Sequence, residues 1–187
     1  MKIKYGLGLL ITLFGAVYHS PGTIARSEVL LPELSIERIA PPDEMIREVF
    51  VYINQARSKP CKCGNKRYGA VPPLVYNEKL AAAAQNHTNW MASTLKLSHT
   101  QPKRNVANAW DRIAQQDYKW SLVEENIAAG QPTAREVVDD WIKSPGHCKN
   151  LMDGAIKEVG VGFKYTASGN YHYYWTADFA TSQQKSL

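Results

Sequence analysis

The sequence has no hydrophobic run long enough to cross a bilayer as a helix. Its main apolar stretch, residues 6–17, falls short of the roughly 20 residues that a membrane helix needs. The stretch follows Lys2 and Lys4, and a short apolar run after a basic start is typical of a secretory signal peptide. We therefore expect residues 1–25 to be a signal peptide that is cleaved after Ala25. The alternative is that the segment stays uncleaved as an anchor. The absence of a cysteine near position 20 argues against a lipoprotein anchor.

The sequence also lacks a strong excess of charge of either sign. It contains 22 basic and 17 acidic residues, and removal of the signal peptide would leave 20 basic residues against the same 17. An excess this small does not favour nucleic acid as a partner. We interpret the basic cluster of Lys59, Lys62, Lys66 and Arg67 as a solvated loop.

Cysteine is scarce, since the chain has only three. In an exported protein three cysteines predict one disulfide and one unpaired thiol. The sequence contains no internal repeat and no low-complexity tract. About 160 residues would remain after cleavage, which is enough for one domain with a hydrophobic core.

The pattern of apolar residues divides the rest of the chain into helices followed by strands. Residues 26–42 contain Pro32, Pro41 and Pro42 with weak periodicity, so we expect a linker or arm that precedes a domain at 43–181. Helical spacing and capping residues predict four helices. The expected helices lie at about 43–59, 77–97, 106–116 and 133–143, with a loop at 61–74. We expect Ser144, Pro145 and Gly146 to end the last of these helices and a short turn to follow before the strands.

Two segments near the C-terminal end of this domain switch to the alternation of a strand. Residues 159–165 and 171–179 flank a turn at 166–170, which predicts an antiparallel hairpin with Trp175 in the core. Helices that precede such a hairpin indicate the α+β class, as a sandwich in which helices cover a small antiparallel sheet.

Three polar residues at element boundaries are the candidates for a functional site. His99, Glu125 and His147 match no compact metal-binding signature in their spacing, and the sequence has no G-x-S-x-G or H-E-x-x-H motif. Two neutral histidines and a carboxylate could hold zinc with a coordination position left open. The alternative is that each of the three hydrogen-bonds a loop backbone.

Other polar residues have structural interpretations. Strand-like alternation directs Glu124 away from Glu125, so we expect Glu124 to face solvent. His87 shares a helix face with apolar residues, which is typical of a hydrogen-bonded, half-buried histidine. His172 lies among aromatic residues, so we expect it either to be exposed at the surface or to pack against its neighbours. His147 and Cys148 are adjacent, and neighbouring side chains usually point apart, so we expect them to have separate roles.

Eight sequence blocks occur in order between about residues 44 and 180. They are INQARSKP, CG, PPLVYNEKLAAAAQNH, LSHT, EENIAAG, VVDDWIKSPGHCKNLM, EVGVGF and YYWTADFA. In this order they resemble bacterial members of the CAP superfamily, whose domain is also called the SCP domain. The resemblance implies an α-β-α sandwich with a central antiparallel sheet and a surface cleft.

The resemblance also implies which residues form the cleft. It places the cleft histidines at His99 and His147 and the glutamate at Glu125. The chemistry of these donors makes zinc or another divalent cation the possible cofactor. Many eukaryotic members have a second glutamate where this sequence has Ser144, so the full set of four is absent. The resemblance further implies a disulfide between Cys63 and Cys148, which leaves Cys61 unpaired.

Three functions from different classes are compatible with these residues. The first is an exported binding module for an extracellular lipid, sterol, glycan or peptide. The second is a zinc-dependent hydrolase that uses His99, Glu125 and His147 as its catalytic candidates. The third is a structural or interaction protein of the cell surface. We favour binding by a secreted or periplasmic monomer, with no role for nucleic acid and with enzymatic activity left open.

Overall fold

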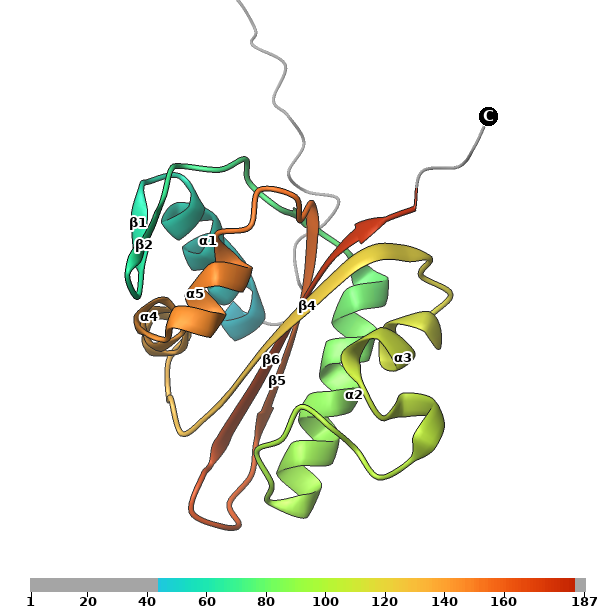
Figure 1. Cartoon of the computed structure of the whole chain (residues 1–187). Helices are drawn as coiled ribbons and strands as arrows, with labels where there is room; N and C mark the ends of the chain where they lie inside the picture. The colour runs from blue at the N-terminus through green and yellow to red at the C-terminus, as the bar shows by residue number, and fades with distance from the viewer. Residues whose placement is uncertain (1–43, 184–187) are drawn as a thin grey trace, which may run out of the picture. The chain divides into compact units, whose positions relative to one another are not determined.

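The computed structural model describes residues 44–183, and Figure 1 shows its elements. The expected signal peptide at 1–25 and the expected linker at 26–42 lie outside the described residues. Within 44–183, none of the helices combines the length and the apolar character that a membrane span requires.

The described part of the chain forms three layers, with a sheet between two groups of helices (Figure 1). The sheet has the strand order β3-β5-β6-β4, and these strands are Val75–Tyr76, Glu158–Tyr165, Tyr173–Ser182 and Trp120–Ala129. One face packs against α2 (Glu78–Thr94) and α3 (Ala109–Ala114). The other face packs against α1 (Glu44–Arg57), α4 (Ala134–Lys143) and α5 (Pro145–Leu151). The predicted α+β class and its sandwich of helices and sheet are therefore confirmed.

The sheet is antiparallel except at one edge. β5 pairs with β6 and β6 pairs with β4 in antiparallel register, with Glu125 opposite Asp178. The two-residue β3 pairs in parallel with β5, which the expected antiparallel sheet did not include. The segment 61–74, expected to be a loop, also contains a small hairpin of β1 (Cys61–Cys63) and β2 (Lys66–Tyr68). Its turn includes Gly64 at φ +59°, a conformation that glycine adopts without strain.

Two of the predicted helix starts are present. The Asn77 side chain accepts hydrogen bonds from the backbone N–H groups of Lys79 and Leu80 at the start of α2. At the start of α4, Thr133 accepts one from Glu136 N. Such caps satisfy backbone donors that have no partner within the helix.

The expectation of a turn after Ser144 is wrong, because a further helix begins there. Ser144 ends α4, and Pro145 is the first residue of α5. Proline suits the first helical position, since it has no N–H to satisfy and its φ is already helical. The Pro-Gly sequence thus ends one helix and starts another, and α5 carries both His147 and Cys148.

The contact between α2 and β5 depends on two glycines. A Cβ atom on Gly160 would lie 1.9 Å from the backbone nitrogen of Ala81, and one on Gly162 would lie 2.6 Å from the carbonyl carbon of Ala84. The helix therefore rests directly on the backbone of the strand. This close approach fixes the position of α2, and with it the loop that follows α2 and carries His99.

Candidate functional site

The edge strand β4 carries the two adjacent carboxylates of the site to opposite faces of the sheet. Glu125 faces α2 and α3 and is 9% exposed. The Glu124 side chain points the other way, as alternation predicted, but that side is covered by α5. Its side chain is only 13% exposed, and it lies 3.6 Å from the Lys149 ammonium. The expectation that Glu124 faces solvent is therefore wrong.

Glu125 is held by a histidine and a buried arginine. Its Oε1 accepts a hydrogen bond of 2.8 Å from His99 Nδ1, and its Oε2 pairs with the Arg112 guanidinium, which is 2% exposed. Burial alone would raise the pKa of Glu125. The hydrogen bond from His99 and the charge of Arg112 outweigh burial and hold the pKa below its usual range. Glu125 is therefore ionised.

Arg112 also fixes the loop that contains His99. Its Nη1 donates to the carbonyl oxygens of His99 and Ala107, each at 3.2 Å. The sequence reasoning missed this residue. A signal was present, because Ala109, Arg112 and Ile113 form the buried face of α3, and a cation on such a face needs an anionic or carbonyl partner.

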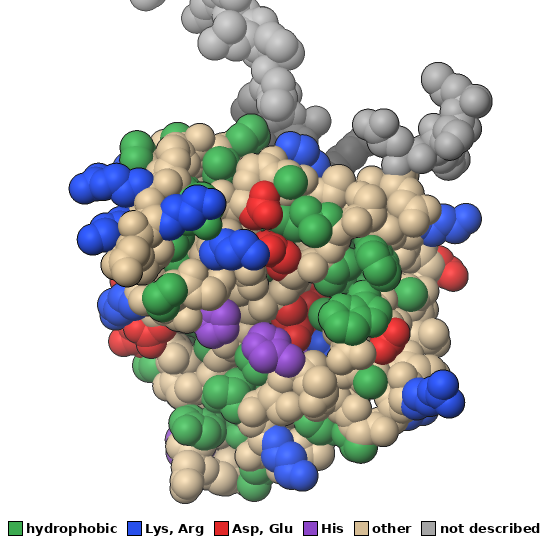
Figure 2. All heavy atoms as spheres, viewed as in Figure 1, with side chains coloured by type: hydrophobic (Ala, Val, Ile, Leu, Met, Phe, Trp, Pro, Cys, Tyr) green, Lys and Arg blue, Asp and Glu red, His purple; other side chains and the backbone are tan. Residues whose placement is uncertain are grey.

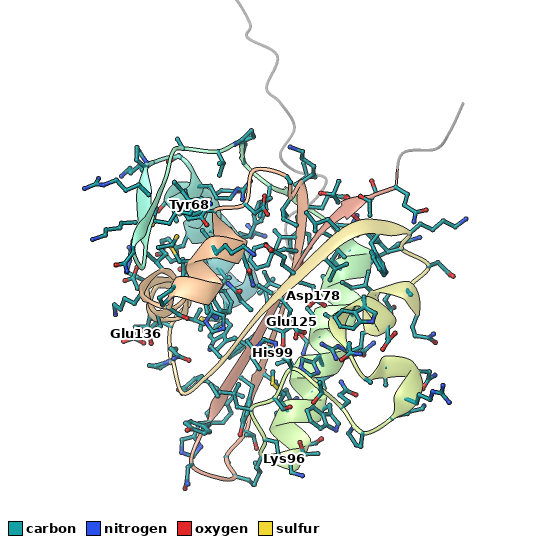
Figure 3. All side chains as sticks on the ribbon, viewed as in Figure 1. Tyr68, Lys96, His99, Glu125, Glu136 and Asp178 are labelled. Atoms are coloured by element: carbon teal, nitrogen blue, oxygen red, sulfur yellow. A yellow bond between two sulfur atoms is a disulfide. The ribbon has the colours of Figure 1, made fainter. Side chains whose placement is uncertain are left out.

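His99 extends from the loop after α2, and its side chain is 53% exposed. Donation from Nδ1 to Glu125 fixes the tautomer and leaves Nε2 as an acceptor. Figure 3 shows His99 and Glu125 together in front of the sheet, with Asp178 nearby.

His147 reaches the same site from α5, on the other side of β4. Its ring centroid lies 6.5 Å from that of His99. Its backbone is fixed to the strand, because Asn126 Nδ2 donates to the His147 carbonyl at 3.1 Å and Asn150 Nδ2 donates to Asn126 Oδ1 at 3.0 Å. Burial, with a smaller effect of His99, lowers the pKa of His147. Within residues 44–183 its ring makes no hydrogen bond.

The structure thus brings the three predicted site residues together at the edge of the sheet. Figure 2 shows two histidine side chains side by side on this face, next to acidic and hydrophobic side chains. A hollow of about 260 Å³ adjoins His99 and Glu125. It is also lined by Asn108, Val123 and the indole of Trp110, which is 48% exposed.

A second carboxyl lies behind Glu125 and was not found from the sequence. Asp178 is completely buried on β6, and no donor reaches either of its oxygens from the described part of the chain. Burial and the charge of Glu125 raise the pKa of Asp178 well above its ordinary value. Asp178 is therefore the neutral member of the pair. An aspartate in an otherwise buried strand was the signal in the sequence.

His87 supports the site without lining it. Its Nδ1 accepts from Gln101 at 2.8 Å and its Nε2 donates to Ser98 O at 2.9 Å, so both ring nitrogens are used. Burial lowers the pKa of His87 to about 4, which keeps the ring neutral. The predicted structural role fits this environment, although the residue is fully buried rather than half-buried.

The cysteines lie at the base of α5. Cys63 and Cys148 are joined, with an S–S distance of 1.96 Å, and they are the pair that the resemblance implies. The Sγ of the unpaired Cys61 lies 3.6 Å from that of Cys148. The bridge connects the β1–β2 hairpin to the helix that carries His147.

The donors at this site fit a cation with two imidazole ligands. His99 Nε2 and a ring nitrogen of His147 are available as donors, and imidazole nitrogens are common zinc ligands. Glu125 does not fit as a direct ligand, because both of its oxygens already bind His99 or Arg112. Its position behind His99 is that of the carboxylate which commonly orients a metal-binding histidine.

These features define the class of the protein: a three-layer domain with a histidine–glutamate cleft at the edge of its sheet. The model of the cysteine-rich secretory protein (CAP) family matches residues 50–179. The chain therefore belongs to the CAP family.

Relatives in sequence and in structure agree with this assignment. The Bacillus subtilis protein YkwD is 32% identical over 107 residues, which are 57% of this chain and 39% of YkwD. An extracellular SCP-domain protein of Bacillus anthracis superimposes with a TM-score of 0.59 at 25% identity, over 76% of this chain and 44% of that one. An outer surface protein of Borrelia burgdorferi has a TM-score of 0.62 at 20% identity, over 76% of this chain and 96% of the Borrelia protein. This chain thus spans less than half the length of the two Bacillus relatives.

Proposed function

We propose that this protein acts outside the cytoplasm as a binding domain whose cleft holds a divalent cation and, through it, an anionic extracellular ligand. The observation that carries the proposal is the approach of His99 and His147 to a ring-centroid distance of 6.5 Å, with Glu125 fixing the tautomer of His99. The basic-then-apolar start of the sequence and the Cys63–Cys148 bridge support export, since such bridges persist in oxidising compartments.

Two ligands from the protein leave coordination positions for other groups. Imidazole nitrogens suit zinc, which takes four ligands in most protein sites. A cation held there supplies a positive charge that attracts carboxylate or carbonyl oxygens of a bound molecule. The chain contributes the two imidazoles, and Glu125 and Arg112 keep His99 in place.

The environment of Glu125 favours binding over hydrolysis. A general base must reach the proton that it removes and must have a pKa near the working pH. Glu125 is 9% exposed, its pKa is lowered, and both of its oxygens are already hydrogen-bonded. It is suited to orienting His99 and poorly suited to activating water.

The adjoining hollow favours a polar ligand with a flat apolar face. At about 260 Å³ it is below the usual size of a pocket that encloses a drug-sized molecule, so it would not bury a sterol or a lipid tail. The exposed indole of Trp110 lies with Asn108 beside the opening. Among the candidate ligands, an acidic glycan matches this combination of an apolar face, hydrogen-bonding groups and a cation.

Calorimetric titration of Zn²⁺ into protein purified without chelators or a histidine tag tests the cation site. We expect one site in the wild type and its loss in His147→Ala. The control is His172→Ala, because His172 is an exposed histidine near the β5–β6 turn, away from the cleft. Glu125→Gln should weaken binding by about 10–100-fold without abolishing it, as expected for a residue that orients a ligand. Equal affinity in wild type and His147→Ala would refute the site.

The ligand class is tested separately with immobilised polygalacturonate, as an acidic glycan, and with phosphatidylglycerol vesicles. Retention on polygalacturonate that requires Zn²⁺ and is lost in Trp110→Ala supports the proposal. Binding to vesicles alone, or retention that is independent of Zn²⁺, would contradict it.

A further inference from the structure

All three cysteines of the chain lie in one cluster apart from the cleft. Their sulfur atoms are within 4.8 Å of one another. Cys148 is fully buried, Cys63 is 5% exposed and Cys61 is partly exposed. The disulfide joins Cys63 to Cys148, so the thiol of Cys61 lies against an existing disulfide, 3.6 Å from one of its sulfurs.

The local structure explains why both Cys61 and Cys63 reach Cys148. They are the first and third residues of β1, and side chains two apart in a strand project from the same face. That face of the hairpin meets the base of α5, where Cys148 lies. Either Cys61 or Cys63 can therefore serve as the partner of Cys148 without turning the strand over.

We propose that Cys61, Cys63 and Cys148 form a thiol–disulfide exchange site, in which Cys148 is bonded alternately to Cys63 and to Cys61. The Cys61 thiol loses its proton, and the resulting thiolate attacks Sγ of Cys148. The Cys61–Cys148 bond forms as the Cys63–Cys148 bond breaks, and Cys63 leaves as a thiolate that takes up a proton. One disulfide and one thiol are present before and after, so the exchange requires no oxidant or reductant.

The exchange requires a small movement of the hairpin. Attack proceeds along the axis of the disulfide that is broken, and three sulfurs within 4.8 Å of one another are not yet collinear. The element that must move is a two-stranded hairpin of three-residue strands, which has little stability of its own. The short hairpin, rather than α5, is therefore the element expected to move during exchange.

The two bonded forms differ in the thiol that they leave free. With Cys63 bonded, the free thiol is Cys61, which is partly exposed and can meet a low-molecular-weight thiol or disulfide. With Cys61 bonded, the free thiol is Cys63, which is almost completely buried in the present structure. The exchange thus determines whether the domain offers a thiol to such molecules. In both forms Cys148 remains tethered, so His147 keeps its support.

The test is disulfide mapping of the wild-type protein after incubation at pH 8.5. Exchange is stopped with acid, the protein is unfolded in acidic guanidinium, and free thiols are labelled there with N-ethylmaleimide, because exchange requires a thiolate. We expect one label per molecule, divided between Cys61 and Cys63. Label confined to Cys61 at all incubation times would refute the proposal.

Two variants provide an independent readout. Cys63→Ser should form a Cys61–Cys148 bridge and retain the wild-type CD spectrum, whereas Cys61→Ser should keep the Cys63–Cys148 bridge and show no exchange. A folded Cys63→Ser protein with two free thiols would overturn the proposal. If Cys63→Ser does not fold, the distribution of label in the wild type decides.

Discussion

Replacing Arg112 by methionine should strongly destabilise the domain, because it leaves Glu125 as a buried charge without its cation. Arg112 is 2% exposed, and its guanidinium pairs with Glu125 while donating to the carbonyls of His99 and Ala107. Removing one partner of a buried ion pair typically costs about 3–5 kcal/mol. Glu125 keeps its hydrogen bond from His99, so we expect a value near the lower end, about 3 kcal/mol, with the pKa of Glu125 raised.

Urea unfolding at pH 7 measures this cost, and a double-mutant cycle assigns it to the pair. Glu125→Gln should reduce the penalty of Arg112→Met, which gives a coupling free energy of about 1–3 kcal/mol. Lys143→Ala is the control, because Lys143 pairs with Asp140 at the exposed end of α4 and its loss should leave the urea midpoint unchanged. A cost below about 1 kcal/mol for Arg112→Met, with no coupling to Glu125, would refute the reasoning.

Three further predictions concern His87, Asp178 and Gly160. Burial lowers the pKa of His87 from 6.5 to about 4. Protonation then favours the unfolded chain, and the free energy of unfolding should fall by roughly 3 kcal/mol between pH 6.5 and pH 4. In His87→Gln, the free energy of unfolding measured by urea titration should decrease by about 3 kcal/mol less between these two pH values than in the wild type. The same decrease in both proteins would contradict the lowered pKa of His87. Asp178→Asn should change the free energy of unfolding, measured by urea titration at pH 7, by less than about 1 kcal/mol, because a neutral aspartic acid and an asparagine are both neutral hydrogen-bond donors. A larger loss would mean that Asp178 is ionised. Gly160→Ala should cost at least about 3 kcal/mol in thermal unfolding, since its Cβ meets the backbone of Ala81, whereas Gly69→Ala, which meets nothing within 4 Å, should be neutral.

Features that depend on neighbours in the sequence were predictable. Asn77 and Thr133 begin their helices because a short polar side chain satisfies the next few N–H groups, and that relation is visible in the sequence. The alternation in residues 159–165 and 171–179 likewise predicted the central hairpin. The same local logic failed at Pro145, because a proline after a helix can end that helix or begin another.

The residues around the cleft could be predicted only in part. His99, Glu125 and His147 stood out as polar residues at element boundaries and by resemblance to a family. Arg112 and Asp178 are unusual residues for buried positions, which was a signal in the sequence, but their partner could not be predicted because each approaches Glu125 from a different element. Glu124 shows the same limit, since alternation gave its direction correctly while α5, which covers that side, was unknown.

The strand order has a consequence for the growing chain. The two central strands, β5 and β6, are synthesised after every other strand and helix among the described residues. Until they are made, α2 has no strand to pack against and β4 has no strand to pair with. The apolar faces of these elements therefore stay exposed to solvent until β5 and β6 are synthesised. Folding is therefore expected to follow synthesis of residues 158–182 and to proceed in one late step. A chain that ends before residue 158 should be a substrate for chaperones and proteases, however many of its helices are complete.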